Sequence, residues 1–175
     1  MRRIAMLLSV LMLCACAPTV SPSDSAGIPV ISGQPALVTT DLPSATLTQL
    51  SGTNEISIHD IAMPRVINLW ATWCSSCRKE FALLASTEFA GQVVAINVRD
   101  LSQSSAGLST ARTLAASTAD VFPIYIDKND TLMTALGVTG LPLTIAVNSE
   151  HVIVDVEYGE LTHDSLVRLI KASES

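Results

Sequence analysis

Two cysteines, Cys74 and Cys77, are separated by two residues at the point where a short apolar run gives way to an amphipathic one. If this pair begins a helix, the two positions share one face, and the thiols can close a disulfide. The first cysteine would lie at the helix N-terminus, where unpaired backbone N–H groups and the helix dipole favour a thiolate. This arrangement suits reversible thiol–disulfide exchange, although a structural disulfide or half of a zinc site is also compatible with the pair alone.

The zinc alternative needs further ligands with suitable spacing. The chain has no second pair of cysteines with this spacing, and its histidines, His59, His151 and His163, are scattered along the sequence. Structural zinc sites normally draw their ligands from closely spaced pairs. We therefore expect no metal, and we expect no cofactor.

The sequence around the dithiol predicts a strand followed by a helix. Residues 66–70 form a nearly continuous apolar run, which is typical of a strand covered on both faces. From Ser75 onward, apolar side chains recur at helical spacing and place Cys77 and Phe81 on the inner face. The dithiol is therefore expected at a strand-to-helix junction.

The remaining pattern predicts an α/β fold. Before the dithiol, two alternating segments form a predicted hairpin at residues 45–50 and 56–61. After it, further strands are predicted at residues 93–98, 122–126, 143–147 and 152–156, with helices near residues 108–115, 132–136 and 162–170. The short link 148–151 requires its two strands to be antiparallel. Together these elements predict a mixed central sheet with helices on both faces.

The N-terminus has the pattern of an export signal. A basic start precedes the apolar run 4–13, which is shorter than the roughly 20 residues of a membrane-spanning helix. The following sequence, Leu13-Cys14-Ala15-Cys16, resembles the bacterial lipobox, which implies cleavage before Cys16 and lipid attachment to it. The alternative is an ordinary signal peptide in which both cysteines are incidental apolar residues.

This interpretation divides the chain into three segments. Residues 1–15 are the expected lipoprotein signal peptide, residues 16–35 the lipidated cysteine with a flexible tether rich in Pro and Ser, and residues 36–175 the folded domain. With Cys14 removed and Cys16 blocked, Cys74 and Cys77 are the only free pair. The net charge of −6 and the absence of a basic run give no case for a nucleic-acid partner.

Three stretches resemble a known family. They are residues 68–81, which read NLWATWCSSCRKEF, residues 137–142, which read GVTGLP, and an extra αβ unit between the second central strand and Leu132. In these features the chain resembles the thioredoxin-fold proteins of the TlpA/ResA type, the membrane-tethered thiol–disulfide oxidoreductases of bacteria. The resemblance covers the chain from about residue 36 to the end and implies a thioredoxin-like fold with an αβ insertion.

The resemblance also implies roles for individual residues. Cys74 would be the nucleophile that forms a mixed disulfide, and Cys77 the resolving thiol that releases the product. Glu80, which alone would be taken for a solvated helix charge, would be a carboxylate that assists proton transfer as Cys77 deprotonates. Asn68 occupies the position of a buried aspartate in small cytoplasmic thioredoxins and cannot accept a proton, so proton handling would fall to Glu80 or to water.

A substrate-binding wall is implied in the same way. Pro142 would be a cis proline that places the backbone of Leu141 beside the cysteines, where it would pair with an extended substrate segment. Trp70 is expected in the core, whereas Trp73, next to the nucleophile, is expected to shape the substrate surface.

The sequence as a whole favours a lipid-anchored reductase on the extracytoplasmic face of the cell membrane. It would receive electrons from a membrane electron-donor protein and pass them to disulfides in exported proteins, with apocytochrome c maturation as one implied client pathway. A dithiol oxidase acting in the opposite direction would use the same residues. A redoxin-type peroxidase is disfavoured because Thr72 precedes Cys74 by two residues rather than three, and a surface binding module with an inert disulfide remains an alternative.

Overall fold

The computed structural model describes residues 37–175 except 38, 64, 100–104, 117 and 119–120. The predicted signal peptide 1–15 and the tether 16–35 with its lipidated Cys16 lie outside the described residues. Within the described ranges, no helix combines the length and the apolar character needed to cross a membrane.

A mixed sheet forms the centre of the described chain. Its seven strands are arranged in the order β2-β1-β5-β4-β3-β6-β7. β3, β4 and β5 are parallel, whereas β1, β2, β6 and β7 each run antiparallel to their neighbours. The strands are β1 (Thr46–Gln49), β2 (Glu55–Ser57), β3 (Arg65–Trp70), β4 (Val93–Asn97), β5 (Ile124–Ile126), β6 (Leu143–Val147) and β7 (Ile153–Tyr158).

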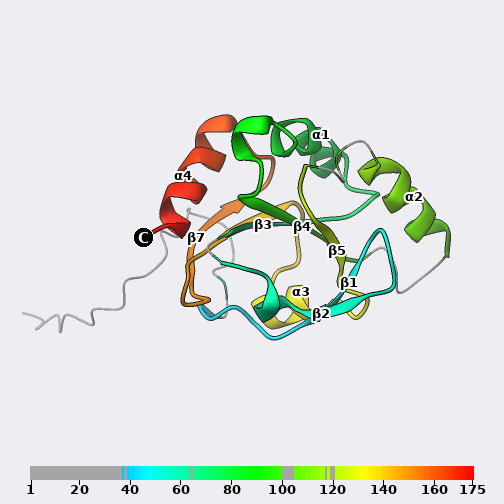
Figure 1. The fold of residues 1–175 in the computed structure, drawn as a ribbon, viewed down its shortest axis with the longest axis horizontal. Helices are drawn as coiled ribbons and strands as arrows, with labels where there is room; N and C mark the ends of the chain where they lie inside the picture. Colours follow the sequence, from blue (N-terminus) through cyan, green and yellow to red (C-terminus); the bar gives the residue numbers. More distant parts are fainter. Residues whose placement is uncertain (1–36, 38, 64, 100–104, 117, 119–120) are drawn as a thin grey trace, which may run out of the picture.

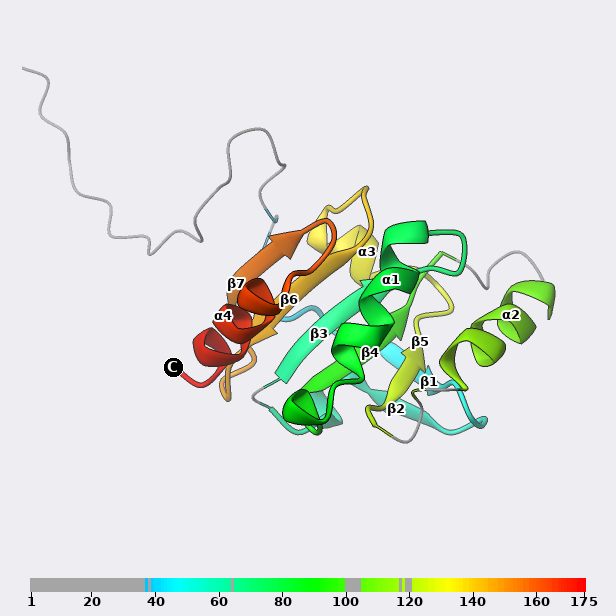
Figure 2. The same cartoon turned by 90° about the horizontal axis from the view of Figure 1, so that it is seen from above.

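Helices cover both faces of this sheet (Figures 1 and 2). One face carries α1, α2 and α4, and the other carries α3 together with a short 3-10 helix, η1. The helices are α1 (Ser75–Leu84), α2 (Ser105–Ala115), α3 (Thr131–Leu136) and α4 (His163–Ser173), with 3-10 helices η1 (Ile58–Asp60) and η2 (Thr87–Phe89). This confirms the predicted fold class, including the N-terminal hairpin and the inserted α2–β5 unit.

Two apolar cores explain why the central strands are so hydrophobic. On the α1 side, Phe81 and Leu166 pack in one buried cluster, and on the α3 side Leu132 and Met133 pack in another. Every residue of β4 is buried. A strand that faces two cores cannot alternate polar and apolar side chains, which is the pattern seen in the sequence.

The observed elements differ from the predicted ones mainly at their ends. The second hairpin strand stops at Ser57 because that residue caps η1. Its hydroxyl accepts from the N–H of His59, and its own N–H donates to the carboxylate of Asp60. The strand predicted from Phe122 begins at Ile124, after Pro123. Thr162 is the N-cap of the last helix.

The sheet topology brings three chain segments to the same end of the central strands. β3 and β4 are parallel, with Trp70 opposite Asn97, so the residues that follow both strands leave the sheet at the same end. The N–H of Val98 donates to the carbonyl of Trp70 at 2.9 Å. β6 is antiparallel to β3, with Leu143 opposite Leu69, so the residues that precede β6 arrive at this same end. The dithiol therefore lies at an end of the sheet shared with residues 98–99, which follow β4, and with the α3–β6 connection.

Candidate active site

The dithiol occupies the first turn of α1, as predicted. Cys74 is the N-cap residue with extended backbone angles, and its sulfur accepts from the N–H of Cys77 at 3.2 Å. The two sulfurs form a disulfide of 2.04 Å. Cys74 is 5% exposed and Cys77 fully buried, so an incoming group reaches the first sulfur more readily. Accessibility and the helix terminus both make Cys74 the better nucleophile of the pair.

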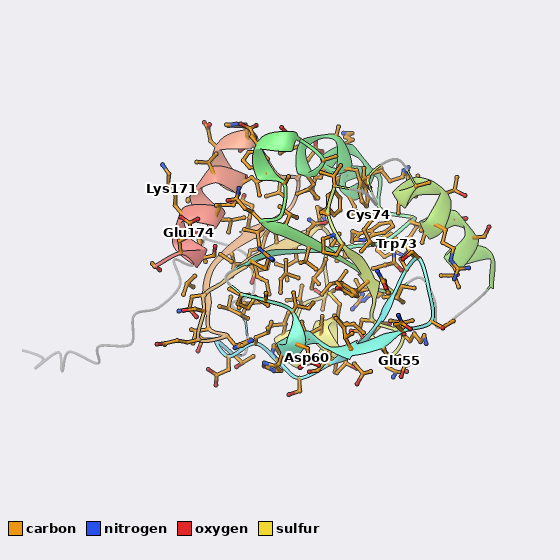
Figure 3. All side chains as sticks on the ribbon, viewed as in Figure 1. Glu55, Asp60, Trp73, Cys74, Lys171 and Glu174 are labelled. Carbon is orange, nitrogen blue, oxygen red and sulfur yellow. A yellow bond between two sulfur atoms is a disulfide. The ribbon has the colours of Figure 1, made fainter. Side chains whose placement is uncertain are left out.

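The two tryptophans near the dithiol have different environments. Trp70 is fully buried and packs edge-on against Phe81, with ring centroids 4.7 Å apart. Trp73 is 59% exposed, and within the described residues no other large hydrophobic side chain is exposed. Figure 3 shows Trp73 beside Cys74, across the molecule from Lys171 and Glu174. Trp70 is confirmed as a core residue, while Trp73, whose apolar surface is exposed, immediately precedes Cys74.

Glu80 is buried within α1 rather than solvated. It lies one helical turn after Cys77 and is only 2% exposed. Its carboxylate accepts from the N–H of Leu161 at 2.6 Å and from the side-chain amide of Asn68 at 3.0 Å. Burial raises the pKa of Glu80 to about 7, even though both hydrogen bonds favour the charged form. A carboxyl group with this pKa can both accept and release a proton near neutral pH.

A second layer of polar groups holds this carboxylate. Asn68 is fully buried, and its Nδ2 donates both to Glu80 and to Oγ1 of Thr144 at 2.9 Å. The side chain of Asn68 is therefore oriented with its donor toward Glu80. Sequence reasoning identified Asn68 but missed Thr144, whose only signal is a hydroxyl within the otherwise apolar strand β6. The backbone donor from Leu161 leaves no signal in the sequence.

This geometry predicts a pH-dependent cost for replacing Asn68→Asp. The change would bring two carboxyl groups to about the separation that Nδ2 and Oε2 now have, 3.0 Å. Two buried carboxyl groups this close cannot both ionise readily, so one of them keeps its proton to a higher pH in the folded protein than in the unfolded chain. The folded state therefore loses stability as the pH rises. We expect the free energy of unfolding to fall by about 2–4 kcal/mol at pH 8, and by less at pH 5, in chemical denaturation.

The double variant Asn68→Asp/Glu80→Gln is the matched control, because it restores a single carboxyl group at the site. Its stability should depend less steeply on pH than that of the single variant. An equal loss of stability at both pH values in the single variant would mean that the two groups do not interact.

The bond between Leu141 and Pro142 is cis, as the resemblance implied. Pro142 is buried and Leu141 is half-buried, immediately before β6. The carbonyl of Pro142 accepts from the N–H of Gly159 at 3.0 Å, so this segment is held against the end of β7. Since β6 pairs with β3, the Leu141–Pro142 segment reaches the edge of the sheet from which the dithiol extends.

Other groups that could bind a metal or ligand lie elsewhere. Within the described residues, no cluster of three or more His, Cys, Asp or Glu side chains could hold a metal ion. The rings of His59 and His151 are tilted by 51° with centroids 4.9 Å apart, and His163 contacts Glu88. A pocket between β1, α2 and β5, lined in part by Arg112, contains none of the predicted site residues.

Comparisons with known proteins agree with this geometry. The family model described as Redoxin matches residues 37–170. The chain is 29% identical over 144 residues to the thiol-disulfide oxidoreductase ResA of Bacillus subtilis (strain 168), covering 77% of this chain and 76% of that protein. It is 32% identical over 125 residues to the thioredoxin-like protein YneN of the same organism, covering 69% and 71%.

The fold has solved counterparts as well. A crystal structure described as a thio-disulfide isomerase from Thermus thermophilus superposes with a TM-score of 0.64 at 21% identity, covering 78% of this chain and 96% of that one. This likeness supports the thioredoxin-like fold. Together with the Cys74–Cys77 pair at the start of α1, the matches show that the chain belongs to the redoxin family and, within it, to the TlpA/ResA-like thiol-disulfide oxidoreductases.

Proposed function

We propose that this thiol-disulfide oxidoreductase is a reductase of disulfides in exported proteins and works on the extracytoplasmic face of the cell membrane. The observation that carries the proposal is the Cys74–Cys77 pair at the N-terminus of α1, in which Cys74 is the less buried cysteine and Cys77 precedes the buried Glu80 by one helical turn. The export signal and the lipobox-like sequence ending at Cys16 support the location. A lipid on Cys16 anchors the domain to the bilayer.

The reaction is a pair of thiol–disulfide exchanges. In the reduced enzyme, the Cys74 thiolate attacks one sulfur of the substrate disulfide, which breaks that bond and releases the first substrate thiolate. Cys77 then attacks the Cys74 sulfur of the mixed disulfide and releases the second substrate thiolate. Two electrons pass from the dithiol to the substrate, and the enzyme is left with the Cys74–Cys77 disulfide seen in the structure.

Glu80 handles the proton of the resolving step. Cys77 is fully buried, so its thiol needs an acceptor within the protein or a water before it can attack. Glu80 lies one turn away with a pKa of about 7 and accepts this proton, which then passes to the departing substrate thiolate. The hydrogen bonds from Asn68 and Leu161 keep its carboxylate in place.

The substrate is an extended protein segment that carries a disulfide. The half-buried Leu141 offers its backbone as a pairing partner, with Pro142 fixing the turn, and the exposed indole of Trp73 covers apolar side chains next to the substrate cysteine. Turnover then requires a membrane electron-donor protein that reduces the Cys74–Cys77 disulfide. We propose apocytochrome c, which is exported before its cysteines bind haem, as one client.

Trapping with Cys77→Ser tests the proposal. Without the resolving thiol, Cys74 still attacks the substrate disulfide, but the mixed disulfide cannot be released. We expect the full-length variant, produced in its own host, to accumulate covalent complexes that dissociate on reduction. Mass spectrometry of these complexes should identify exported proteins as the clients.

The double variant Cys74→Ser/Cys77→Ser is the control and should trap nothing. If the only trapped species were a membrane protein that supplies disulfides, the enzyme would work as an oxidase. Absence of any mixed disulfide would contradict redox exchange altogether and leave an inert disulfide in a binding module.

A further inference from the structure

Arg99 has an unusual backbone conformation at the active-site edge of the sheet. It follows β4 by two residues and has a φ of 61°, in the left-handed region that non-glycine residues rarely adopt. Asp130, at the start of α3, has a φ of 52°. The N–H of Arg99 donates to the carboxylate of Asp130 at 2.5 Å. Two strained residues joined by a hydrogen bond at the edge of a site indicate a conformation that the surrounding structure enforces.

The side chain of Arg99 reaches the segment that precedes the cis proline. Its Nη1 donates to the carbonyl of Thr139 at 3.3 Å, and its Nη2 to the carbonyl of Val138 at 3.5 Å. Only Gly140 separates Thr139 from Leu141, whose backbone is the proposed partner of the substrate. The guanidinium therefore holds the chain two residues before the point of substrate pairing.

Within the described residues, few other hydrogen bonds hold residues 138–140. The N–H of Val138 donates to the carbonyl of Met133 within α3, and no backbone hydrogen bond from Thr139 or Gly140 is seen. An extended substrate segment would pair with this loop as one β-strand pairs with another. The substrate binds more tightly when the loop already has the conformation it takes in the complex. The guanidinium group of arginine holds its N–H donors in a fixed plane. It is therefore better suited to bond two successive carbonyl groups than the ammonium group of lysine.

We propose that Arg99 is a positioning residue that presents the Leu141 backbone to protein substrates. This inference rests on the proposed function, because it assumes that an extended segment pairs with Leu141. Arg99 does not touch the cysteines. It acts on binding of an extended chain and not on the sulfur chemistry.

The test is Arg99→Gly, since glycine adopts a positive φ without strain and keeps the N–H that donates to Asp130, while the guanidinium is lost with the rest of the side chain. We expect the KM for a disulfide-bonded peptide to rise about two- to fivefold, because two long, partly exposed hydrogen bonds are removed. The kcat for that peptide, and the rate with a small aromatic disulfide that needs no backbone pairing, should stay unchanged. Arg65→Gln is the matched control, because Arg65 donates to the carbonyl of Gly91 at the other end of β3.

Hydrogen exchange measured by mass spectrometry tests the positioning independently of activity. In the peptide that spans residues 137–143, the hydrogen-bonded amides of Gly137 and Val138 should exchange faster in Arg99→Gly than in wild type, whereas Arg65→Gln should not change them. An unchanged KM together with unchanged exchange would overturn the proposal, as would an equal loss of rate with both the peptide and the small disulfide. If wild type fails to reduce the peptide at all, the proposed function fails, and the exchange data alone then decide whether Arg99 orders the loop.

Discussion

Replacing Cys74→Ser is expected to lower the rate of disulfide reduction by about 10³-fold or more while the domain stays folded. A serine hydroxyl is not ionised near neutral pH and cannot form a disulfide, so neither exchange step can occur. Cys74 is the N-cap of α1 and accepts from the N–H of Cys77. Serine is a preferred N-cap residue and can accept the same bond, so α1 should remain intact.

Single-turnover reduction of a disulfide-bonded protein by prereduced enzyme is the measurement, with near-ultraviolet circular dichroism as the check on folding. Ser75→Ala is the matched control, because Ser75 is the exposed neighbour of Cys74 in the same helical turn. That variant should react at the wild-type rate. If Cys74→Ser were as active as wild type, the disulfide would be inert and the proposed chemistry wrong.

Local sequence patterns were enough to predict the dithiol and its setting. The strand, the two cysteines and Glu80 all fall within residues 66–80, and hydrophobic periodicity places them on β3 and α1. The ends of elements were predicted less well, because capping decides them. Ser57 ends β2 by starting η1, although the apolar alternation continues to Ile61.

The environment of Glu80 could not be predicted, because its contacts come from distant parts of the chain. Leu161 is 81 residues away and contributes only a backbone N–H, while Thr144 holds Asn68 from a distance of 76 residues. Periodicity alone would also have left Glu80 in solvent, and the cis bond at Pro142 came only from the family resemblance. Nothing in the residue type of Arg99 indicates its positive φ, and the Asp130 carboxylate that accepts from its N–H lies 31 residues away.

Glu80→Gln should flatten the pH dependence of both catalysis and stability. For catalysis, the variant lacks the group that accepts the proton of Cys77, so the rate of the resolving step should fall by about a hundredfold. The wild-type rate should change through a pKa near 7, the value to which burial raises the pKa of Glu80, and this transition should vanish in the variant. Rapid-mixing measurements of the resolving step from pH 5 to pH 9 test this.

The direction in which folding stability changes with pH follows from the raised pKa of Glu80. The unfolded chain releases the Glu80 proton near 4.5, whereas the folded chain keeps it until about 7, so the folded state binds more protons between these values. Folding stability contributed by this group is therefore present below pH 4.5 and is lost as the pH rises to 7, by about 3 kcal/mol in total. Glutamine carries no ionisable proton, so the unfolding free energy of the variant should lack this decline.

Glu160→Gln is the matched control, because Glu160 lies close enough to raise the pKa of Glu80 slightly but is itself exposed and paired with Lys79. It should change the rate of the resolving step little and shift the transition of wild type slightly downward in pH. If Glu80→Gln kept the wild-type pH profile of reduction, Glu80 would have no part in proton transfer, and a water would be the remaining acceptor for Cys77. A variant that lost the rate transition yet kept the wild-type decline in stability would show that another buried group carries the raised pKa.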